Sequence, residues 1–223
     1  MFTFHLVEPA DYEEALNLFW NHFMPFEPAT RLAGCCNKIG YRIYNLDLML
    51  RDMLKRNMCF MAKSQQGDMV GVIFCIIDNK VKNTICESPT KSEYLRQGWP
   101  VDFTPVLLLL DQLCDHQKIM LDKGMSQMLD LFALVVRTDF RCQGIATQLI
   151  TKALNEAKTM GIPLVCITCS SNFSQRCSVK LGFKVENSIL YKDWYCEGQK
   201  IVKDEDIDPV HPAAISYFKI LSN

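Results

Sequence analysis

The sequence predicts a mixed α/β (α+β) fold, built as a single domain over residues 1–223. From Gln127 onward, apolar runs with strand spacing alternate with amphipathic runs of helical spacing, a pattern typical of a mixed sheet covered by helices. Hydrophobic residues make up 49% of the chain and charged residues 22%, which is enough apolar material for a sizeable core. No linker rich in Pro, Gly or Ser divides the chain, so we expect one core.

The N-terminal elements begin with a predicted strand at Phe2–Val7. A helix is predicted from Asp11, because Glu14 follows three residues later as in a capping box. One face of this helix is apolar at helical spacing and carries Ala15, Leu16, Phe19, Trp20 and Phe23. We expect the helix to end at Met24-Pro25-Phe26-Glu27-Pro28, because proline disfavours helical geometry in the residue before it.

A second helix and a hairpin follow. The helix is predicted over Leu46–Arg56 with Asn45 as its cap, and its apolar face carries Leu46, Met49, Leu50, Met53 and Leu54. Two apolar runs, Met58–Lys63 and Met69–Asp78, flank a short polar segment that contains Gly67, which is typical of a β-hairpin. Thr104-Pro105 predicts the start of one long helix reaching about Asp122, because proline is tolerated in the first turn.

The second half of the chain supplies the rest of the predicted sheet. The elements alternate as a strand, a helix, a strand and a helix over Gln127–Val136, Gly144–Met160, Pro163–Cys169 and Asn172–Leu181. Gly182 stands where a helix terminator belongs. Two closing strands are predicted over Phe183–Trp194 and Ala213–Leu221.

Charge and hydropathy exclude several classes of protein. The net charge is -1, from 24 basic and 25 acidic side chains spread along the chain, so we expect no nucleic-acid partner. The first residues lack the pattern of a signal peptide, and no apolar run reaches membrane-spanning length. We therefore expect a soluble, cytoplasmic protein without a membrane partner.

The eleven cysteines do not predict a disulfide framework, because their number is odd and the chain is long enough to build a core without disulfide bonds. Cys166 and Cys169 form a CxxC pair, but they lie in a predicted strand, whereas zinc-binding pairs usually occupy turns. We therefore expect reduced thiols and no metal, with a thiol-based redox or metal protein as the alternative.

A strand–turn–helix segment carries the main candidate for ligand binding. The strand residues Leu134, Val135 and Val136 lead through a polar turn into a helix that opens with small residues at Gly144 and Ala146. The first turn of a helix offers unpaired backbone N–H groups and the positive end of its dipole, which suits a phosphate group. The alternative reading of Gly144 and Ala146 is close packing of the helix on the sheet.

The pattern Arg141-x-x-Gly144-x-Ala146 resembles the Q/R-x-x-G-x-G/A pyrophosphate loop of the GNAT superfamily of N-acetyltransferases. The order of elements after the loop, up to Leu181-Gly182-Phe183, is also the order in that family. The resemblance implies a central mixed, mostly antiparallel, twisted sheet of about seven strands flanked by helices, and acetyl-CoA as co-substrate. It assigns cofactor binding to the strand Leu134, Val135 and Val136, to the loop and helix residues Arg141, Cys142, Gln143, Gly144, Ile145, Ala146 and Thr147, and to Ser174. Cys142-Gln143 and Ala146 depart from the residues the family often has there.

A narrower resemblance is to the insect arylalkylamine N-acetyltransferases. It rests on the segment Cys169–Arg176, on the Lys180–Phe183 run, and on Glu27-Pro28 after the first helix. In that subfamily the glutamate of an E-P segment is a general base and two serines four residues apart assist, which implies catalytic roles for Glu27, Ser170 and Ser174. Phe173 stands where the family often has a tyrosine, which leaves the acid role open.

Chemical reasoning supports a base at Glu27. A primary alkylamine resembles lysine, with a pKa of about 10.4, and is almost entirely ammonium at neutral pH, so a proton must be removed. Glu27 suits that role if it is partly buried beside Trp20, Phe23 and Phe26; the alternative is a solvated loop glutamate. Ser174 could donate a hydrogen bond to the departing sulfur, with Ser170 orienting it, while the alternative for both is a role as capping and turn residues.

The predicted acceptor is a small arylalkylamine of the dopamine, octopamine, tyramine or serotonin type, bound by an acidic residue and aromatic walls. The stretch Phe19–Phe26 could instead be core alone. His22 and His211 are lesser candidates for proton relay. One alternative is another substrate for the enzyme: a polyamine or agmatine as the acceptor, or a longer acyl group as the donor. Several extra carboxylates in the pocket would favour polyamines. Another alternative is a catalytically silent acyl-CoA-binding module. We expect a monomer or weak dimer.

Overall fold

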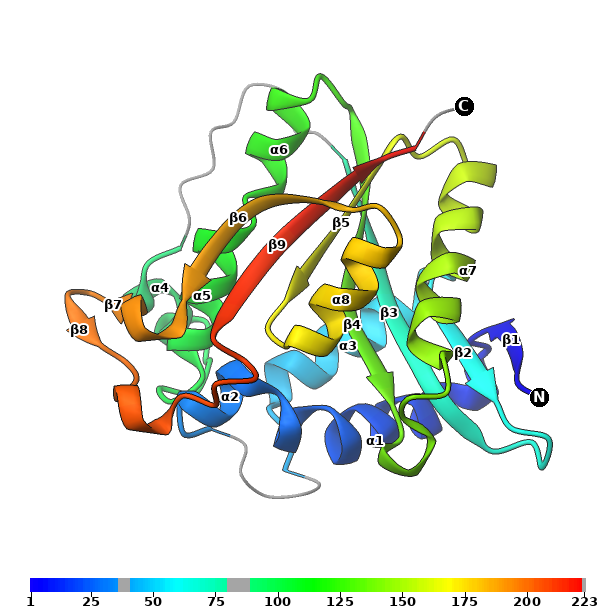
Figure 1. Cartoon of the computed structure of the whole chain (residues 1–223), viewed down its shortest axis with the longest axis horizontal. Coiled ribbons are helices and arrows are strands. Elements are labelled where there is room, and N and C mark those ends of the chain that lie inside the picture. Colours follow the sequence, from blue (N-terminus) through cyan, green and yellow to red (C-terminus); the bar gives the residue numbers. More distant parts are fainter. Residues whose placement is uncertain (36–40, 80–88, 222–223) are drawn as a thin grey trace.

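The computed structural model describes residues 1–35, 41–79 and 89–221. A seven-stranded sheet in the order β1-β2-β3-β4-β5-β9-β6 forms its centre, as Figure 1 shows. All neighbouring strands are antiparallel except the parallel pair β4 and β5. The strands are β1 (Thr3–Leu6), β2 (Phe60–Lys63), β3 (Met69–Asn79), β4 (Gln127–Val136), β5 (Leu164–Cys169), β6 (Lys184–Leu190) and β9 (Ala213–Ile220). The predicted mixed, mostly antiparallel sheet is confirmed.

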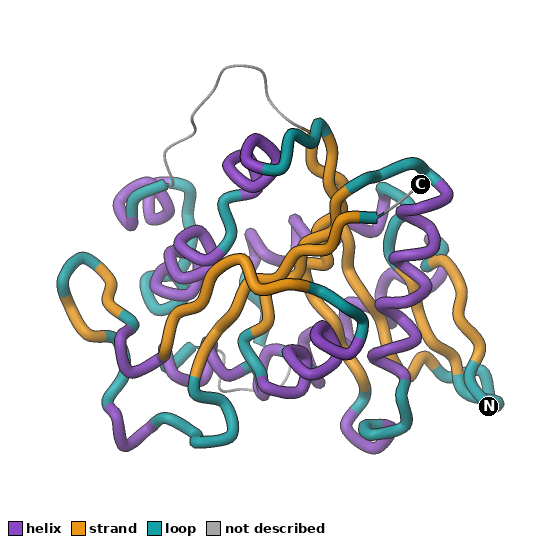
Figure 2. Tube along the Cα trace, turned by 45° about the horizontal axis from the view of Figure 1, so that its top comes forward, coloured by secondary structure: helices purple, strands orange, loops and turns teal. Residues whose placement is uncertain are grey.

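Helices cover both faces of this sheet, as the tube view in Figure 2 also shows. One core lies between the sheet and α1 (Tyr12–His22), α3 (Tyr44–Lys55) and α5 (Thr104–Leu113). A second core lies under α7 (Ile145–Thr159) and α8 (Asn172–Lys180). Three shorter helices are α2 (Pro28–Leu32), α4 (Lys91–Arg96) and α6 (His116–Asp122), and β7 (Tyr195–Cys196) pairs with β8 (Gln199–Lys200) in a small separate hairpin.

Asp11 is the N-cap residue of the first α-helix, but the predicted capping box with Glu14 does not form, and the cap predicted at Asn45 is wrong. The first α-helix begins at Tyr12, and the Glu14 carboxylate accepts a hydrogen bond from the Met69 N–H on β3, 3.0 Å away, instead of closing a capping box. The second begins at Tyr44, and the Asn45 amide donates to the Gln97 carbonyl at 2.8 Å. In each case a tertiary partner takes the polar group that local spacing assigns to a cap.

The predicted long helix from Thr104 to Asp122 is two helices. The first, α5, ends at Leu113, and the Asp115 carboxylate starts α6 by accepting a hydrogen bond from the Lys118 N–H at 3.0 Å. The predicted strand over Phe183–Trp194 is also too long, because β6 ends at Leu190 and a 3-10 turn follows. The first break places Asp115 in the lining of a cavity, and the second places the Tyr191 hydroxyl beside the Ser170 carbonyl.

The parallel strands β4 and β5 separate soon after they start. Their paired positions are Met128 with Leu164, Leu129 with Val165, and Asp130 with Cys166, and no pairing follows. Among the described residues, β4 pairs only with β3 from Leu131 onward, and the rest of β5 pairs only with β9. In Figure 1 the two arrowheads point apart. The facing backbone edges of both strands are therefore open to a ligand.

Gly71 on β3 allows α7 to pack closely against the sheet. A Cβ atom at Gly71 would lie 3.0 Å from Ile145 Cγ2, 3.1 Å from the Val135 carbonyl and 3.2 Å from Leu149 Cδ1. We expect Gly71→Val to lower the free energy of unfolding by about 1–3 kcal/mol, because overpacking moves α7 away from the sheet. Urea denaturation followed by circular dichroism measures this change, and an unchanged midpoint would contradict the close packing.

No helix among the described residues is both long enough and apolar enough to cross a bilayer. The cysteines that are described form no disulfide.

Candidate active site

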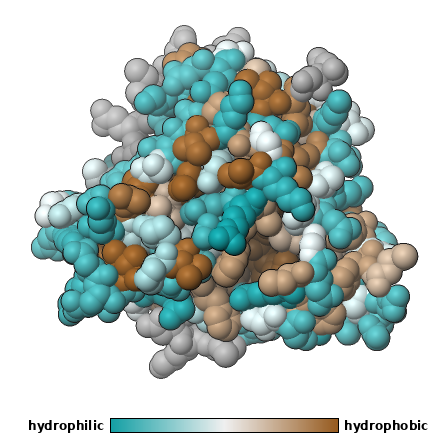
Figure 3. All heavy atoms as spheres, viewed as in Figure 1, coloured by the Kyte–Doolittle hydropathy of each residue, from teal (hydrophilic) through white to brown (hydrophobic). Residues whose placement is uncertain are grey.

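Two cavities meet where β4 and β5 separate. The first, of about 550 Å³, lies among α1, α3, α5 and the sheet; the second, of about 560 Å³, lies between the β4–α7 loop and α8. Figure 3 shows the entrance beside α8 as a hollow with an apolar interior. Both cavities are lined by six common residues, namely Phe23, Glu27, Phe132, Ala133, Thr168 and Ser170. A group bound in one cavity can therefore reach a group bound in the other.

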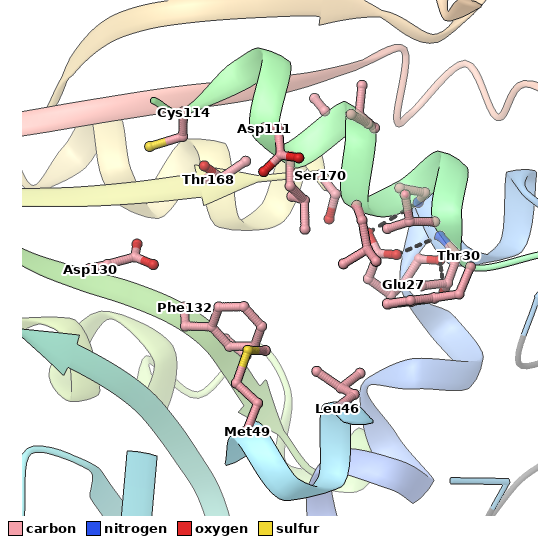
Figure 4. Close-up of a pocket in the computed structure, with 18 of the residues that line it drawn as sticks. Glu27, Thr30, Leu46, Met49, Asp111, Cys114, Asp130, Phe132, Thr168 and Ser170 are labelled. Atoms are coloured by element: carbon pink, nitrogen blue, oxygen red, sulfur yellow. Dashed lines mark hydrogen bonds between the residues drawn. The ribbon is translucent and has the colours of Figure 1, made fainter. Parts of the chain in front are cut away.

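Glu27 is one of these shared residues. Its side chain is only 7% exposed, and it starts α2 by accepting hydrogen bonds from the Ala29 N–H at 3.0 Å and the Thr30 N–H at 2.6 Å. Figure 4 shows both bonds at the edge of the first cavity. The alternative of a solvated loop glutamate is wrong, because the carboxylate is buried and fixed by two backbone donors. The predicted role as a base stays a prediction.

Ser170 and Ser174 lie on either side of the α8 N-terminus. Ser170 directly follows β5 and lines both cavities, and its carbonyl accepts a hydrogen bond from the Tyr191 hydroxyl at 2.8 Å. Ser174 lines the second cavity from the first turn of α8, and its hydroxyl donates to the Ser171 carbonyl at 2.9 Å. The residue that caps α8 is Ser171, whose Oγ accepts from the Ser174 N–H. Neither predicted serine is the cap of α8, but the bond from Ser174 to the Ser171 carbonyl is a local turn interaction, so the alternative of a turn role stays open for Ser174.

A β-bulge lies at the point where the two strands separate. Phe74 pairs with Ala133 and Cys75 with Leu131, so Phe132 is the extra residue on β4. A bulge bends its strand and redirects a side chain. Phe132 accordingly lines both cavities, and Figure 4 shows its ring above Met49.

The loop before α7 presents backbone donors to the second cavity. Cys142 has φ 61° and Gly144 has φ 79°, and Gly144 begins α7 without a side-chain cap. Positive φ values in such a turn direct successive N–H groups to one side, and the open helix terminus adds its dipole. The nearest atom to a Cβ at Gly144 would be 3.8 Å away, so the glycine serves conformation, and the close-packing alternative is wrong for this position.

Most predicted cofactor residues face this second cavity. Those that line it are Leu134, Val135, Val136, Arg141, Cys142, Gly144, Ile145, Ala146, Thr147 and Ser174, whereas Gln143 does not. The cavity also carries positive charge from Arg31, Arg141 and Arg176, against a single carboxylate, Glu27, among the described residues that line it. Arg141 donates to the His22 carbonyl at 3.1 Å, which ties the loop to the end of α1. The lining suits an anionic, phosphate-bearing ligand.

The first cavity has the opposite charge. Its carboxylates are Glu27, Asp78, Asp111, Asp115 and Asp130, with His116 as the basic side chain, and its aromatic walls are Phe19, Phe23, Tyr94, Trp99, Phe103 and Phe132. The Tyr94 hydroxyl donates to Asp111 at 2.5 Å. Burial raises the pKa of Asp111, while the bond from Tyr94 opposes that shift. This lining suits a cation with an apolar body.

His116 lies between two of these carboxylates. Its Nδ1 is 2.5 Å from Asp78 Oδ2, and its Nε2 is 3.7 Å from Asp130 Oδ2. Burial disfavours the charged ring, but Asp130 and the bond to Asp78 together raise the pKa of His116 to about 12. Burial raises the pKa of Asp130 to about 7, against the attraction of His116. His116 is therefore an imidazolium that neutralises part of the acidic lining.

The two histidines considered for proton relay both line the second cavity. His22 lies 3.5 Å from the Thr138 hydroxyl, and burial lowers its pKa. His211 accepts a hydrogen bond from the Asn172 N–H through Nδ1 at 3.1 Å, and Phe173 packs edge-on against its ring. His211 thus has a structural role at the start of α8.

Cys166 and Cys169 both lie in β5, as predicted, and they belong to different cores. Side chains three positions apart on a strand point to opposite faces of a sheet, so the two thiols cannot share one metal ion.

Sequence reasoning did not find the acidic lining. Asp130 is a polar residue inside an otherwise apolar strand, which is a detectable signal of a functional or paired site. Asp78 sits at the end of β3 and Asp111 near the end of α5, and neither position stands out until α5 and α6 are folded over the sheet.

Comparison with known proteins agrees with this geometry. Residues 109–183 match the sequence model of the Acetyltransferase (GNAT) family. The match spans β4, the loop before α7, α7, β5 and α8, which are the elements that form the second cavity. The chain has the GNAT fold, and the resemblance predicted from its sequence is confirmed.

Solved structures from insects share the fold over the whole chain. Arylalkylamine N-acetyltransferase 2 from Aedes aegypti is 24% identical, with 99% of each chain covered and a TM-score of 0.86. Drosophila melanogaster polyamine N-acetyltransferase, an enzyme that forms N-acetylagmatine, is 18% identical, with 99% of this chain and 100% of that chain covered and a TM-score of 0.81. A mosquito arylalkylamine N-acetyltransferase-like protein, 5b, is 15% identical over 99% and 100%, with a TM-score of 0.82.

Proposed function

We propose that this chain is an acetyl-CoA-dependent N-acetyltransferase that acetylates the primary amine of a small cation with an apolar or aromatic body. The observation that carries the proposal is the charge separation between two joined cavities. The second cavity carries three arginines and open backbone donors, whereas the first is acidic and aromatic. An anionic acyl carrier and a cationic amine therefore fit opposite sides of one reaction centre.

The second cavity fits the parts of acetyl-CoA, which would supply an activated acetyl thioester. The backbone donors from Cys142 to Thr147, with Arg141, would hold the diphosphate. The open edge of β4 from Leu134 to Val136 would bond the amide groups of the pantetheine arm.

Glu27 is the proposed general base. It is the carboxylate that lines both cavities, and its two backbone bonds hold it in place while its remaining lone pairs stay available. An ammonium with a pKa near 10.4 must lose a proton before it can attack a carbonyl carbon. Glu27 would accept that proton directly or through one water molecule.

Ser170 and Ser174 are proposed to serve the departing thiolate. A thiol has a pKa of about 8.5, so its conjugate base leaves readily and needs stabilisation more than full protonation. The Ser174 hydroxyl, now bonded to the Ser171 carbonyl, faces the second cavity and would turn to donate to the sulfur. Ser170 lines both cavities.

A thiol-release assay with acetyl-CoA and a panel of amines tests the proposal. The panel should include 2-phenylethylamine, tyramine, putrescine, agmatine and free amino acids. Release of CoA thiol that depends on one or more of the amines supports an acetyltransferase. Binding of CoA without release by any of them would leave only an acyl-CoA-binding protein.

The arylalkylamine class is the acceptor that the sequence predicts, and the aromatic walls of the first cavity support it. Its carboxylates favour a second candidate, a polyamine or agmatine, which carries another cation beyond the reacting amine. Asp78 and Asp130 are partly neutralised by His116, whereas Asp111 has only the uncharged Tyr94 as its hydrogen-bond donor among the described residues. Asp111 is therefore the carboxylate best placed to bind a distal cation.

Replacing Asp111 separates the two candidate substrates. We expect Asp111→Asn to raise the KM for agmatine or putrescine by about tenfold or more, because a charged hydrogen bond contributes about 1.5–3 kcal/mol. The KM for 2-phenylethylamine should stay nearly constant. Asp122→Asn, at an exposed position at the end of α6, is the matched control. Equal effects on both kinds of amine would argue against a distal-cation site at Asp111.

A further inference from the structure

A second cluster of reactive groups lies in the first cavity, away from Glu27. Cys114 lies between α5 and α6, where its side chain is partly exposed and lines this cavity. Figure 4 shows Cys114 and Asp130 on the opposite side of the cavity from Glu27. The proposed acetyl transfer assigns no role to Cys114.

Three groups near Cys114 can donate a hydrogen bond to its sulfur. They are the thiol of Cys166 on β5, the imidazole of His116 on α6 and the hydroxyl of Ser216 on β9, and each favours a negative charge on the sulfur. Ser216 is fully buried, and its Oγ has no hydrogen-bond partner among the described residues. A buried hydroxyl without a partner is costly, and a thiolate at Cys114 would give it one.

One imidazole and several carboxylates lie near the sulfur of Cys114, and they belong to different helices and strands. The bond from Cys166 and the positive His116 lower the pKa of Cys114 well below that of an ordinary thiol, although burial opposes the shift. Correspondingly, the bond to Cys114 raises the pKa of Cys166. The nearby carboxylates are Asp78 on β3, Asp130 on β4, Asp111 on α5, Asp115 at the start of α6, and Glu186 on β6.

Cys114, His116 and Asp78 are arranged in the order thiol, imidazole and carboxylate, as in an activated cysteine nucleophile. Cys114 contacts His116, and His116 Nδ1 is fixed 2.5 Å from Asp78 Oδ2. A thiol, a basic ring beside it and a carboxylate that orients the ring are the parts that make a cysteine nucleophilic in enzymes. Here the three parts open into a cavity large enough for a small organic molecule.

We propose that Cys114 is a second reactive centre, a nucleophilic thiol that adds to small electrophiles carrying an activated carbon–carbon double bond. The sulfur lone pair forms a new C–S bond at the β-carbon, and the π electrons move toward the activating carbonyl group. His116 then gives a proton to the α-carbon. The adduct contains every atom of both reactants, and it occupies the space that an amine would need.

The test uses N-ethylmaleimide at pH 6 on the full chain, with mass spectrometry to follow each cysteine. An ordinary thiol with a pKa of about 8.5 is less than about 1% thiolate at this pH. We expect Cys114 in the folded protein to react at least about tenfold faster than Cys114 in the urea-unfolded chain at the same pH. The margin allows for the weaker nucleophilicity of a low-pKa thiolate.

Two variants identify the activating group. His116→Gln should remove the rate advantage of Cys114, while His5→Gln on the edge strand β1 should keep it. Cys114→Ser should lose the fast adduct altogether. Because these readings count adducts and not acetyl transfer, they are independent of the proposed acetyltransferase activity. The proposal is wrong if folded Cys114 reacts no faster than unfolded Cys114, or if the fast adduct persists in Cys114→Ser.

Discussion

Glu27→Gln is expected to lower kcat for amine acetylation by about 10²–10⁴-fold, the usual contribution of a positioned general base. The amide keeps the shape of the side chain and one oxygen acceptor for the α2 N-terminus, but it cannot take a proton from an ammonium. The variant loses one of the two hydrogen bonds to Ala29 and Thr30, so we expect a stability loss of about 1 kcal/mol. Steady-state kinetics with a saturating amine measures the effect on kcat.

Glu14→Gln is the matched control for this experiment. Glu14 also accepts a hydrogen bond from a backbone N–H, that of Met69, but it lines neither cavity. Its substitution should leave kcat nearly unchanged. If Glu27→Gln loses no more activity than Glu14→Gln, Glu27 has the role of a helix cap and nothing more.

Ala146→Glu is expected to weaken CoA binding strongly while leaving the protein folded. The side chain would place a negative charge among the N–H groups that begin α7, where the proposed diphosphate lies. A carboxylate in the first turn of a helix contributes about 0.3–1 kcal/mol of stability through the dipole, so the melting temperature should hold or rise. We expect the Kd for CoA, measured by isothermal titration calorimetry, to increase at least about 100-fold, since lost phosphate contacts add to charge repulsion.

Thr151→Glu carries the same added charge further along α7, at an exposed position outside the second cavity. Its CoA affinity should differ little from that of the unsubstituted chain. A similar loss of affinity in both variants would indicate a general electrostatic effect and not a diphosphate site at the helix start.

Much of the fold follows from periodicity that the sequence displays directly. The strands at Gln127–Val136 and Pro163–Cys169 and the helices after them are found within one or two residues, because continuous apolar runs and amphipathic spacing agree there. The errors at the two helix starts lie where a polar group has two possible partners. Glu14 and Asn45 satisfy either a cap or a distant backbone group, and only the packed structure decides between them.

The candidate site also has a part that the sequence reveals and a part that only the folded structure reveals. The loop from Arg141 to Thr147 is contiguous, so its phosphate-binding character is visible in the sequence. The acidic cavity is assembled from β3, α5, α6 and β4, and no local pattern joins Asp78, Asp111 and Asp130. Cys114 and His116 are hidden for another reason, since the apolar run before them predicts one unbroken helix through both positions.

Acetyl transfer in this chain requires that an acyl carrier in the second cavity meets an amine in the first at Glu27. A bisubstrate compound, CoA joined through its sulfur and an acetyl bridge to 2-phenylethylamine or agmatine, tests it in one titration. If the cavities meet as described, one of these conjugates binds at least about 100-fold more tightly than CoA alone, in the way of a transition-state analogue. If every conjugate binds no better than CoA, the two cavities do not form one active site.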